Sequence, residues 1–268
     1  MFEPLRNIFR SKREPQLPSV PVGQRVYVIG DIHGRLDLLD ALVRAIETDD
    51  QQSAKAETTI IFLGDLVDRG PQSAGVIKLA MLWQEYRNIR FLTGNHEEMF
   101  LDAFKDVEVM RHFLKHGGRE TILSYGVTPK QFNKASIEDL QVLMQEHVPK
   151  GDRKFLKSFE NMIEIGDYMF VHAGINPKRA MDEQKPRELR WIRDPFLNHR
   201  DSHSHIIVHG HTITEGIDEK NNRIGIDTGA YRSGKLTALV LEGDKRRYIQ
   251  TVEKKKGGIK IVNRDEAQ

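Results

Sequence analysis

Aspartate, asparagine and histidine side chains recur in short, glycine-bounded clusters along this sequence. In chain order these side chains are Asp31, His33, Asp65, Asp68, Asn95, His96, His172 and His211. Carboxylate and amide oxygens together with imidazole nitrogens, without sulfur, suit borderline divalent ions such as Mn, Fe, Zn and Co. The clusters therefore predict a site for divalent metal ions.

Such a set of ligands has a definite chemistry. A carboxylate shared by two ions holds them about 3.5–4 Å apart, the arrangement used by phosphatases and nucleases. The ions lower the pKa of water, which makes a nucleophile at neutral pH, and they neutralise phosphoryl oxygens. An acid near the leaving oxygen and arginine side chains on the phosphate would complete the site. Because the sequence contains no cysteine, a cysteine nucleophile and a thiolate zinc site are excluded.

Each cluster also has a simpler interpretation. Asp65 or Asp68 could cap the helix that follows, and a single histidine at a strand end is more often structural than catalytic. That interpretation needs a separate coincidence for each of the five clusters. A shared metal site explains all of them at once, so we favour it.

Hydrophobic patterning indicates the elements that position these clusters. Short apolar runs typical of buried strands precede them, at residues 26–29, 58–63, 89–92, 168–171 and 205–208. Apolar residues at helical spacing follow the first and second runs. This order predicts an α/β fold with parallel strands and right-handed crossovers. In an open α/β sheet the strand ends converge on one crevice, where ligands bind.

The remainder of the chain divides into three parts. Residues 98–165 show helical periodicity and predict a helical lobe inserted into the domain. Runs at residues 224–226, 236–241 and 248–252 indicate antiparallel strands. Residues 1–21 are basic and punctuated by proline, so we expect a mobile tail before a single domain at 22–268.

Composition restricts the class of protein. The 268 residues are 38% hydrophobic and 30% charged, as in soluble proteins, and no apolar run is long enough to cross a bilayer. We therefore expect a cytoplasmic protein. The formal net charge of +2 is too small to attract the phosphate backbone of a nucleic acid, so we expect no nucleic-acid partner.

The clusters resemble the motifs of the phosphoprotein phosphatase family within the calcineurin-like metallophosphoesterases. The similar motifs are GDIHG at 30–34, GDLVDRG at 64–70, GNHE at 94–97, HAG at 172–174 and GH at 210–211. They occur in the order of the family, and the similar stretch extends over roughly residues 25–252. The sequence looks closest to bacterial and phage members such as the phage lambda phosphatase. The resemblance implies a β-sandwich flanked by helices, in which the strands divide between two sheets.

The resemblance also implies a role for each motif residue. Asp31 and His33 would bind one metal ion and Asp65 would bridge two. The second ion would be bound by Asn95, His172 and His211. His96, oriented by Asp68, would protonate the leaving alkoxide. The phosphate would be bound by Arg69, by Asn95, by Arg193 in the similar stretch WIRD at 191–194, and by Tyr231 in DTGAY at 227–231.

The resulting hypothesis is metal-dependent hydrolysis of phosphoserine and phosphothreonine on proteins, with phosphotyrosine as a further substrate. Two divalent ions are implied, with Mn²⁺ favoured over Fe, Zn and Co. The expected partners are phosphoproteins or phosphopeptides, and no site for a regulatory subunit is recognisable.

Two alternatives stay open. One is symmetrical hydrolysis of diadenosine tetraphosphate, which close relatives perform. Asp68 argues against it, because the similar nucleotide hydrolases carry a non-acidic residue there. The other is a non-catalytic phosphopeptide-binding module, which would have lost a ligand or Arg69, whereas all of them are present.

Overall fold

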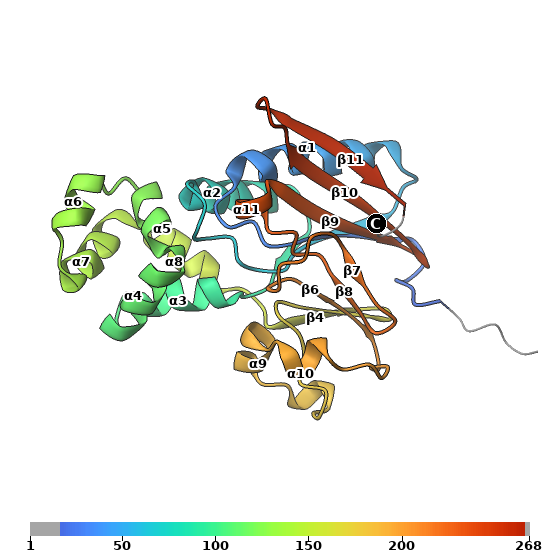
Figure 1. Ribbon diagram of the computed structural model, residues 1–268. Helices are drawn as coiled ribbons and strands as arrows, with labels where there is room; N and C mark the ends of the chain where they lie inside the picture. Colours follow the sequence, from blue (N-terminus) through green and yellow to red (C-terminus); the bar gives the residue numbers. More distant parts are fainter. Residues whose placement is uncertain (1–16, 266–268) are drawn as a thin grey trace, which may run out of the picture.

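Two β-sheets face each other in the computed structural model, which describes residues 17–265 (Figure 1). Helices cover the outer faces, and a helical lobe projects from one side (Figure 1). The six-stranded sheet has the order β11-β10-β9-β1-β2-β3, and the five-stranded sheet has the order β4-β5-β6-β8-β7. This is the α/β sandwich that the family resemblance implies.

The six-stranded sheet combines a parallel and an antiparallel half. Strand β1 pairs in parallel with β2, and β2 pairs in parallel with β3. Strands β9, β10 and β11 continue the sheet from β1 with antiparallel pairing, as predicted for the C-terminal runs at 236–241 and 248–252. The strands are β1 (Gln24–Ile29), β2 (Glu57–Phe62), β3 (Ile89–Phe91), β9 (Lys235–Glu242), β10 (Lys245–Glu253) and β11 (Ile259–Arg264).

The five-stranded sheet differs from the arrangement predicted by patterning alone. Strands β5 and β6 pair with each other and lie in this second sheet, so the five clusters meet from two sheets and not along one. Strand β8 pairs in parallel with β6, although an antiparallel strand was predicted there; only β7 is antiparallel to β8. The strands are β4 (Met162–Ile165), β5 (Tyr168–Val171), β6 (Ile206–His209), β7 (Asp218–Glu219) and β8 (Arg223–Gly225).

Alternation of apolar side chains explains the layered core. On β1, Val26 and Val28 face the second sheet, whereas Tyr27 and Ile29 face the helices. Strand β2 alternates in the same way, with Ile61 packed between the sheets. Because both faces of these strands are covered, the side chains of residues 26–29 and 60–62 are fully buried, as a parallel sheet requires.

The outer layers consist of helices joined by short loops. Helices α1 and α2 cover the six-stranded sheet (Figure 1). On α1, the residues Leu38, Leu39, Leu42 and Ile46 are buried, which is the spacing of one helical face. Phe196 of α10 and Leu189 of α9 pack on the second sheet. The helices are α1 (Leu36–Gln52), α2 (Ser73–Gln84), η2 (Met181–Glu183), α9 (Pro186–Trp191), α10 (Asp194–Leu197) and α11 (Ala230–Ser233).

The lobe is helical, as predicted, but its boundaries differ. Its first helix, α3, already begins at Asn95, and its last, α8, ends at Lys157. Residues 162–165, which were assigned to the lobe, instead form β4 and pair with β5. The lobe consists of α3 (Asn95–Ala103), α4 (Val107–Phe113), the π-helical turn η1 (Leu114–Gly118), α5 (Arg119–Ser124), α6 (Pro129–Lys134), α7 (Ile137–His147) and α8 (Lys150–Lys157).

Most of the predicted basic tail, residues 1–16, lies outside the described residues. Ser19 and Val20, which belong to the described part of the predicted tail, are hydrogen-bonded to the body of the domain. The backbone N–H of Val20 donates to the Gly243 carbonyl at 2.9 Å, and Ser19 N–H donates to Asp167 Oδ2 at 2.8 Å. Within residues 17–265, no helix combines the length and apolar character needed to span a membrane.

Candidate metal centre

The predicted clusters follow β1, β2, β3, β5 and β6; they lie on loops, except that Asn95 and His96 lie in the first turn of α3. Within residues 17–265, only five residues other than glycine have positive φ angles, and all five are predicted site residues. They are His33 (48°), Asp65 (53°), Asp68 (73°), Arg69 (67°) and His211 (63°). Such backbone conformations are costly for L-residues and are typical of functional sites. The loops are therefore shaped to aim these side chains inward at the expense of local strain.

Close backbone approach explains two of the flanking glycines. A Cβ atom on Gly94 would lie 2.2 Å from Asp65 Oδ1, and one on Gly210 would lie 2.0 Å from Asp31 Oδ1. Both distances are far below van der Waals contact. Only glycine therefore lets these two loops pass so close to the carboxylates.

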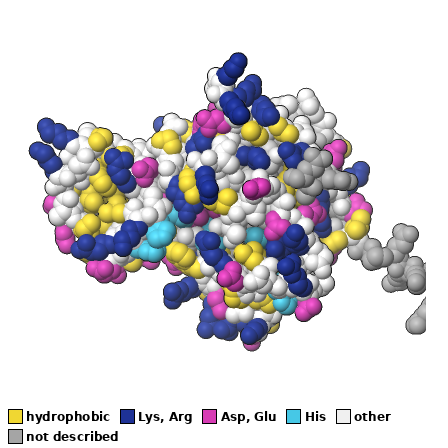
Figure 2. All heavy atoms as spheres, in the orientation of Figure 1, with side chains coloured by type: hydrophobic (Ala, Val, Ile, Leu, Met, Phe, Trp, Pro, Cys, Tyr) yellow, Lys and Arg dark blue, Asp and Glu magenta, His cyan; other side chains and the backbone are white. Residues whose placement is uncertain are grey.

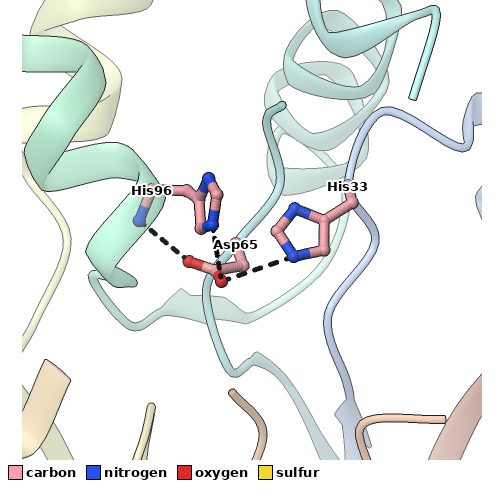
Figure 3. Close-up of side chains that lie close together, drawn as sticks. All are labelled: His33, Asp65 and His96. Atoms are coloured by element: carbon pink, nitrogen blue, oxygen red, sulfur yellow. Dashed lines mark hydrogen bonds and ion pairs between the residues drawn. The ribbon is translucent and has the colours of Figure 1, made fainter. Parts of the chain in front are cut away.

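Asp65 lies at the centre of the site. One oxygen of its carboxylate is 3.5 Å from His33 Nε2 and 3.9 Å from His96 Nε2 (Figure 3). The other oxygen is 3.4 Å from His172 Nε2. Two groups of side chains have ligand atoms within 4.8 Å of one another, and they share Asp65. These groups are His33, Asp65 and His96, and Asp65, His172 and His211. A single buried carboxylate between two clusters of imidazoles is the geometry that a pair of ions requires.

Backbone carbonyls set the tautomers of two of these histidines. His33 Nδ1 is 2.8 Å from the Val67 carbonyl, and His172 Nδ1 is 2.8 Å from the Leu63 carbonyl. Because a carbonyl oxygen only accepts, both Nδ1 atoms carry the proton. Each Nε2 therefore presents a lone pair toward Asp65, which is the orientation of a metal-binding imidazole.

The donor atoms around Asn95 fit a cation. Asn95 Oδ1 lies 2.9 Å from His172 Nε2 and 2.8 Å from His211 Nδ1. Since His172 Nε2 and the amide oxygen are both acceptors, they face each other favourably only when a positive charge lies between them. Asp31 Oδ1 and His211 Nε2 are also buried without a hydrogen-bond partner among the described residues. The set of oxygens and nitrogens therefore fits one or more divalent ions.

Asp31 belongs to the same centre but to neither group of three. Its Oδ2 accepts a hydrogen bond from the His211 backbone N–H at 3.0 Å, which joins the loops after β1 and β6. Burial, together with the neighbouring charges of Asp227 and Asp65, raises the pKa of Asp31 well above its ordinary value. The crowding of three carboxylates in one buried volume is stable only with positive charge nearby.

Asp227 is a site residue that our sequence analysis missed. It is buried, its Oδ2 has no hydrogen-bond partner among the described residues, and burial raises its pKa to about 6. It follows β8 closely, in the same way that the predicted clusters follow their strands. The strand-end signal could therefore have found it.

Burial and charge act oppositely on the central groups. Burial favours the neutral carboxylic acid of Asp65, but the surrounding His172, His96 and His33 outweigh it and lower the pKa of Asp65. Burial lowers the pKa of His33 well below its ordinary range and that of His211 to about 2. An ionised Asp65 beside neutral His33 and His211 is the protonation state needed for metal binding.

His96 and Asp68 form a buried pair beside this centre. His96 Nδ1 is 2.6 Å from Asp68 Oδ2, so the imidazole is held with Nε2 directed toward Asp65. Burial alone would lower the pKa of His96, but Asp65 and Asp68 outweigh it, and the pKa is raised. His96 is close enough to be counted with the metal-binding groups, yet its hydrogen bond to Asp68 is that of an oriented acid.

Arg69 and Tyr231 border the same centre. The Arg69 guanidinium donates to Nε2 of His33 at 2.7 Å, and its other terminal nitrogen lies 2.9 Å from Nε2 of His96. It also lies over the Tyr231 ring, 4.8 Å from the ring centroid, and that ring contacts the His33 ring edge-on at 5.4 Å. The structure thus brings Arg69 and Tyr231, two of the four residues predicted to bind phosphate, to the metal centre.

Arg193 lies on the other side, after helix α9. Its charge acts on His211, whose pKa is lowered by burial, by His172 and in smaller part by Arg193. Among the described residues its guanidinium makes no hydrogen bond and no ion pair, unlike Arg190 in the same segment. A cation without an internal partner beside the centre is available for an anionic substrate.

Two glutamates fasten the site and were not assigned roles from the sequence. The buried Glu97 carboxylate accepts backbone N–H groups of Asp65 and Leu66, each at 2.8 Å, and of Gly94 at 2.9 Å. Glu98 accepts from Arg190 at 3.0 Å and from Trp191 Nε1 at 2.6 Å. The first turn of α3 thereby connects the loop after β2, which carries Asp65, to helix α9.

Comparison with known proteins identifies the class of protein. Residues 24–234 match the profile of the family described as calcineurin-like phosphoesterase. The chain belongs to this family, and it is accordingly a phosphoester-cleaving hydrolase whose buried histidines and aspartates can bind metal.

Relatives within the family have different substrates. The chain is 30% identical to "Serine/threonine-protein phosphatase 1" of Salmonella typhimurium, over 80% of this chain and 90% of that protein. It is 28% identical to "Bis(5'-nucleosyl)-tetraphosphatase PrpE [asymmetrical]" of Oceanobacillus iheyensis, over 80% of this chain and 87% of that protein. It is 26% identical to "Bis(5'-nucleosyl)-tetraphosphatase, symmetrical" of Neisseria gonorrhoeae, over 87% of this chain and 96% of that protein.

Solved structures agree on the fold. A structure described as a putative diadenosine tetraphosphatase aligns with a TM-score of 0.58 at 22% identity, covering 93% of this chain and 98% of the other. A mutant of a cold-active protein tyrosine phosphatase also aligns with a TM-score of 0.58 at 19% identity, covering 91% of this chain and 83% of the other. At such identities the alignments establish the architecture of the sandwich.

Proposed function

We propose that this protein hydrolyses phosphomonoesters on proteins, with phosphoserine and phosphothreonine as substrates and phosphotyrosine as a further one. The observation that carries this proposal is the buried His96–Asp68 pair at 2.6 Å. It supports a reaction that needs a positioned proton donor.

The two substrate classes of the relatives differ in their leaving groups. Hydrolysis of a serine phosphomonoester expels an alkoxide, a strong base that leaves readily only when it is protonated. Hydrolysis of a dinucleoside tetraphosphate expels a nucleotide, whose phosphate is already stable as an anion at neutral pH. An oriented general acid therefore gains much more for the first reaction than for the second.

The side chains divide between metal binding and proton transfer. Asp31, His33 and Asp65 would hold one divalent ion, and Asp65 would also contact the second. The second ion would further be held by Asn95, His172 and His211. When bound, the ions acidify water and offset the negative charge of the phosphate, and Mn²⁺ suits these oxygen and nitrogen ligands.

The remaining residues act on the substrate. Arg69, beside His33, and Arg193, whose charge acts on His211, bind phosphoryl oxygens together with Asn95 and Tyr231. As the water oxygen bonds to phosphorus, the bond between phosphorus and the serine oxygen breaks. His96 gives its Nε2 proton to that serine oxygen, and Asp68 stabilises the imidazolium before this transfer.

Symmetrical hydrolysis of diadenosine tetraphosphate is the second candidate. It is favoured by the relative of that name in Neisseria gonorrhoeae, which aligns over 87% of this chain. The same two ions and the same arginines would serve it. A non-catalytic phosphopeptide-binding role has no comparable support, because no expected ligand is missing from the sequence and all of them are buried.

A substrate panel tests the proposal. Metal-stripped protein is resupplied with Mn²⁺ and given p-nitrophenyl phosphate, peptides with each phosphorylated residue, and diadenosine tetraphosphate. We expect metal-dependent release of phosphate from phosphoserine and phosphothreonine peptides. Cleavage of the dinucleotide alone would show that the second candidate is correct. No turnover of any substrate would exclude both.

A further inference from the structure

Two buried hydroxyls surround Asp68 on the side away from His96. Thr121 Oγ1 is 2.6 Å from Asp68 Oδ1, and the same oxygen accepts the Asp68 backbone N–H at 2.9 Å. Ser73 Oγ accepts that N–H at 3.1 Å and lies 3.0 Å from Thr121 Oγ1. All three residues are completely buried.

The direction of each hydrogen bond follows from the chemistry of the carboxylate. An ionised Asp68 only accepts, so the single hydroxyl proton of Thr121 is donated to Asp68 Oδ1. Thr121 Oγ1 must then be the acceptor in its contact with Ser73. The resulting chain of side chains runs from Ser73 through Thr121 and Asp68 to His96, and each hydroxyl or imidazole proton in it has one acceptor.

This chain joins the helical lobe to the catalytic centre. Ser73 lies at the start of α2, whereas Thr121 lies on α5 of the lobe, 53 residues from Asp68. The lobe also contacts the next residue, because the Gly117 carbonyl accepts the Arg69 backbone N–H at 3.1 Å. A Cβ atom on Gly117, whose φ is 103°, would lie 2.6 Å from that nitrogen. The turn η1 is therefore closely packed against the segment that carries Asp68 and Arg69.

We propose that Thr121 is a positioning residue for the proton donor His96 and that the helical lobe thereby takes part in catalysis. Thr121 anchors one carboxylate oxygen of Asp68, so that the other oxygen stays 2.6 Å from His96 Nδ1. Without the hydroxyl, Asp68 Oδ1 would be buried with no hydrogen-bond donor. The carboxylate would then rotate toward a different donor, and its contact with His96 would be disturbed. This inference rests on the proposed function, in which His96 protonates the leaving oxygen.

The test compares substrates that need the proton to different extents. Phosphoserine peptide expels an alkoxide, whereas p-nitrophenyl phosphate expels a weakly basic phenolate. The variant is Thr121→Val, which keeps the shape of the side chain, and it is loaded with Mn²⁺. We expect kcat for the peptide to fall about 10- to 100-fold, which is less than the loss expected when the general acid itself is removed. We expect kcat for p-nitrophenyl phosphate to fall less than about threefold.

Two further variants separate positioning from folding. Thr121→Ser restores the hydroxyl and is expected to recover most of the peptide activity. Thr251→Val makes the same chemical change at another fully buried threonine. Thr251 lies in β10, and its hydroxyl donates to the Leu38 carbonyl of α1 at 3.2 Å. We expect it to leave the ratio of the two activities unchanged. If Thr121→Val does not fold, Thr121→Ala serves for the same comparison.

The outcomes are distinct. A selective loss on the peptide that Thr121→Ser reverses supports the inference. Equal losses on both substrates, or no loss on either, would overturn it, because Thr121 would then be structural or irrelevant. Wild-type protein that cleaves no phosphomonoester would instead contradict the proposed function itself.

Discussion

At the scale of single residues, the site depends on backbone conformations that only its surroundings can hold. Asp65, Asp68 and Arg69 all have positive φ angles within one loop. Glu97 counteracts the strain by accepting three backbone N–H groups around Asp65. Burial, followed by the charge of Asp65, raises the pKa of Glu97 to about 7. The loop is therefore stiffened by an acid that is itself held in an unfavourable environment.

The proton donor can be tested separately from the metal ligands. We expect His96→Asn to lower kcat for phosphoserine peptide by about 10²–10⁴, the usual contribution of a general acid. Bound Mn²⁺, measured by elemental analysis after gel filtration, should stay at the wild-type level because Asp65 and the other proposed ligands remain. A near-wild-type rate would show that His96 is not the acid.

The bridging carboxylate should behave in the opposite way. Asp65→Asn removes the one charge that both groups of ligands share. We therefore expect the dissociation constant for Mn²⁺, measured by equilibrium dialysis, to rise at least about 10- to 100-fold. The exposed carboxylate of Asp40 offers a control, since Asp40→Asn should leave metal binding unchanged. Unaltered binding by Asp65→Asn would contradict the bridging role.

At the scale of elements, the first turn of α3 joins three parts of the site. Asn95 and His96 face the centre, Glu97 holds the loop after β2, and Glu98 holds α9. The lobe also meets the centre through α5 and η1. In Figure 2, histidine side chains are exposed where the lobe meets the body, and acidic and basic side chains are mixed over the visible face. The lobe is thus built into the site along one edge.

The link from α3 to α9 predicts an effect on substrate binding. Glu98→Gln removes the charge that holds Arg190 and Trp191, just before Arg193. Because Arg193 would contact the phosphate in both the bound and the transition state, we expect KM for p-nitrophenyl phosphate to rise about 5- to 10-fold with little change in kcat. Steady-state kinetics measure this, with Glu146→Gln on the distant helix α7 as control. A fall in kcat with unchanged KM would speak against this role.

At the scale of the whole molecule, a network of charges fastens the end of the six-stranded sheet that lies away from the metal centre. Arg247 donates to both oxygens of Asp49, each at 2.6 Å, and Tyr27 donates to one of them at 2.5 Å. Arg25 is fully buried and contacts Asp50 and Glu242. These contacts connect α1 to β1, β9 and β10. The network stabilises the layers on which the loops of the site depend.

The network predicts how stability depends on pH. Burial alone would raise the pKa of Asp49 and Asp50, but hydrogen bonds from Arg247 and Tyr27 to Asp49, and from Thr58 and Arg25 to Asp50, outweigh it, and both pKa values are lowered. A lowered folded-state pKa adds stability above the unfolded value of about 3.9, and that stability is lost as pH falls through the folded-state pKa. We therefore expect the free energy of unfolding to decline steeply below about pH 4.

A variant on the same helix tests this expectation. Asp49→Asn should lower the free energy of unfolding at pH 7 by about 1–3 kcal/mol and weaken its decline in acid. Asp40→Asn, which removes only an exposed contact with Arg44, should change neither by more than about 0.5 kcal/mol. Urea titrations at pH 7 and at pH 2.5 measure both. Equal effects of the two substitutions would mean that the network adds nothing.

The sequence by itself determined the strands, the clusters that follow them and the class of chemistry. These features are local, because a strand, a tight glycine turn and an adjacent ligand all lie within a few residues of one another. His33, Asp65 and His172 are found in this way, and their convergence follows from the common direction of the strands that precede them.

Only the tertiary structure decided how these strands divide and what holds the site in place. β5 and β6 belong to a second sheet, and patterning could not show it, since a buried strand is apolar on both faces in either arrangement. Thr121 and Glu98 meet their partners across 53 and 93 residues. A hydroxyl or a carboxylate on a helix has no local signature for such a contact, because its partner is chosen by the packing of whole elements.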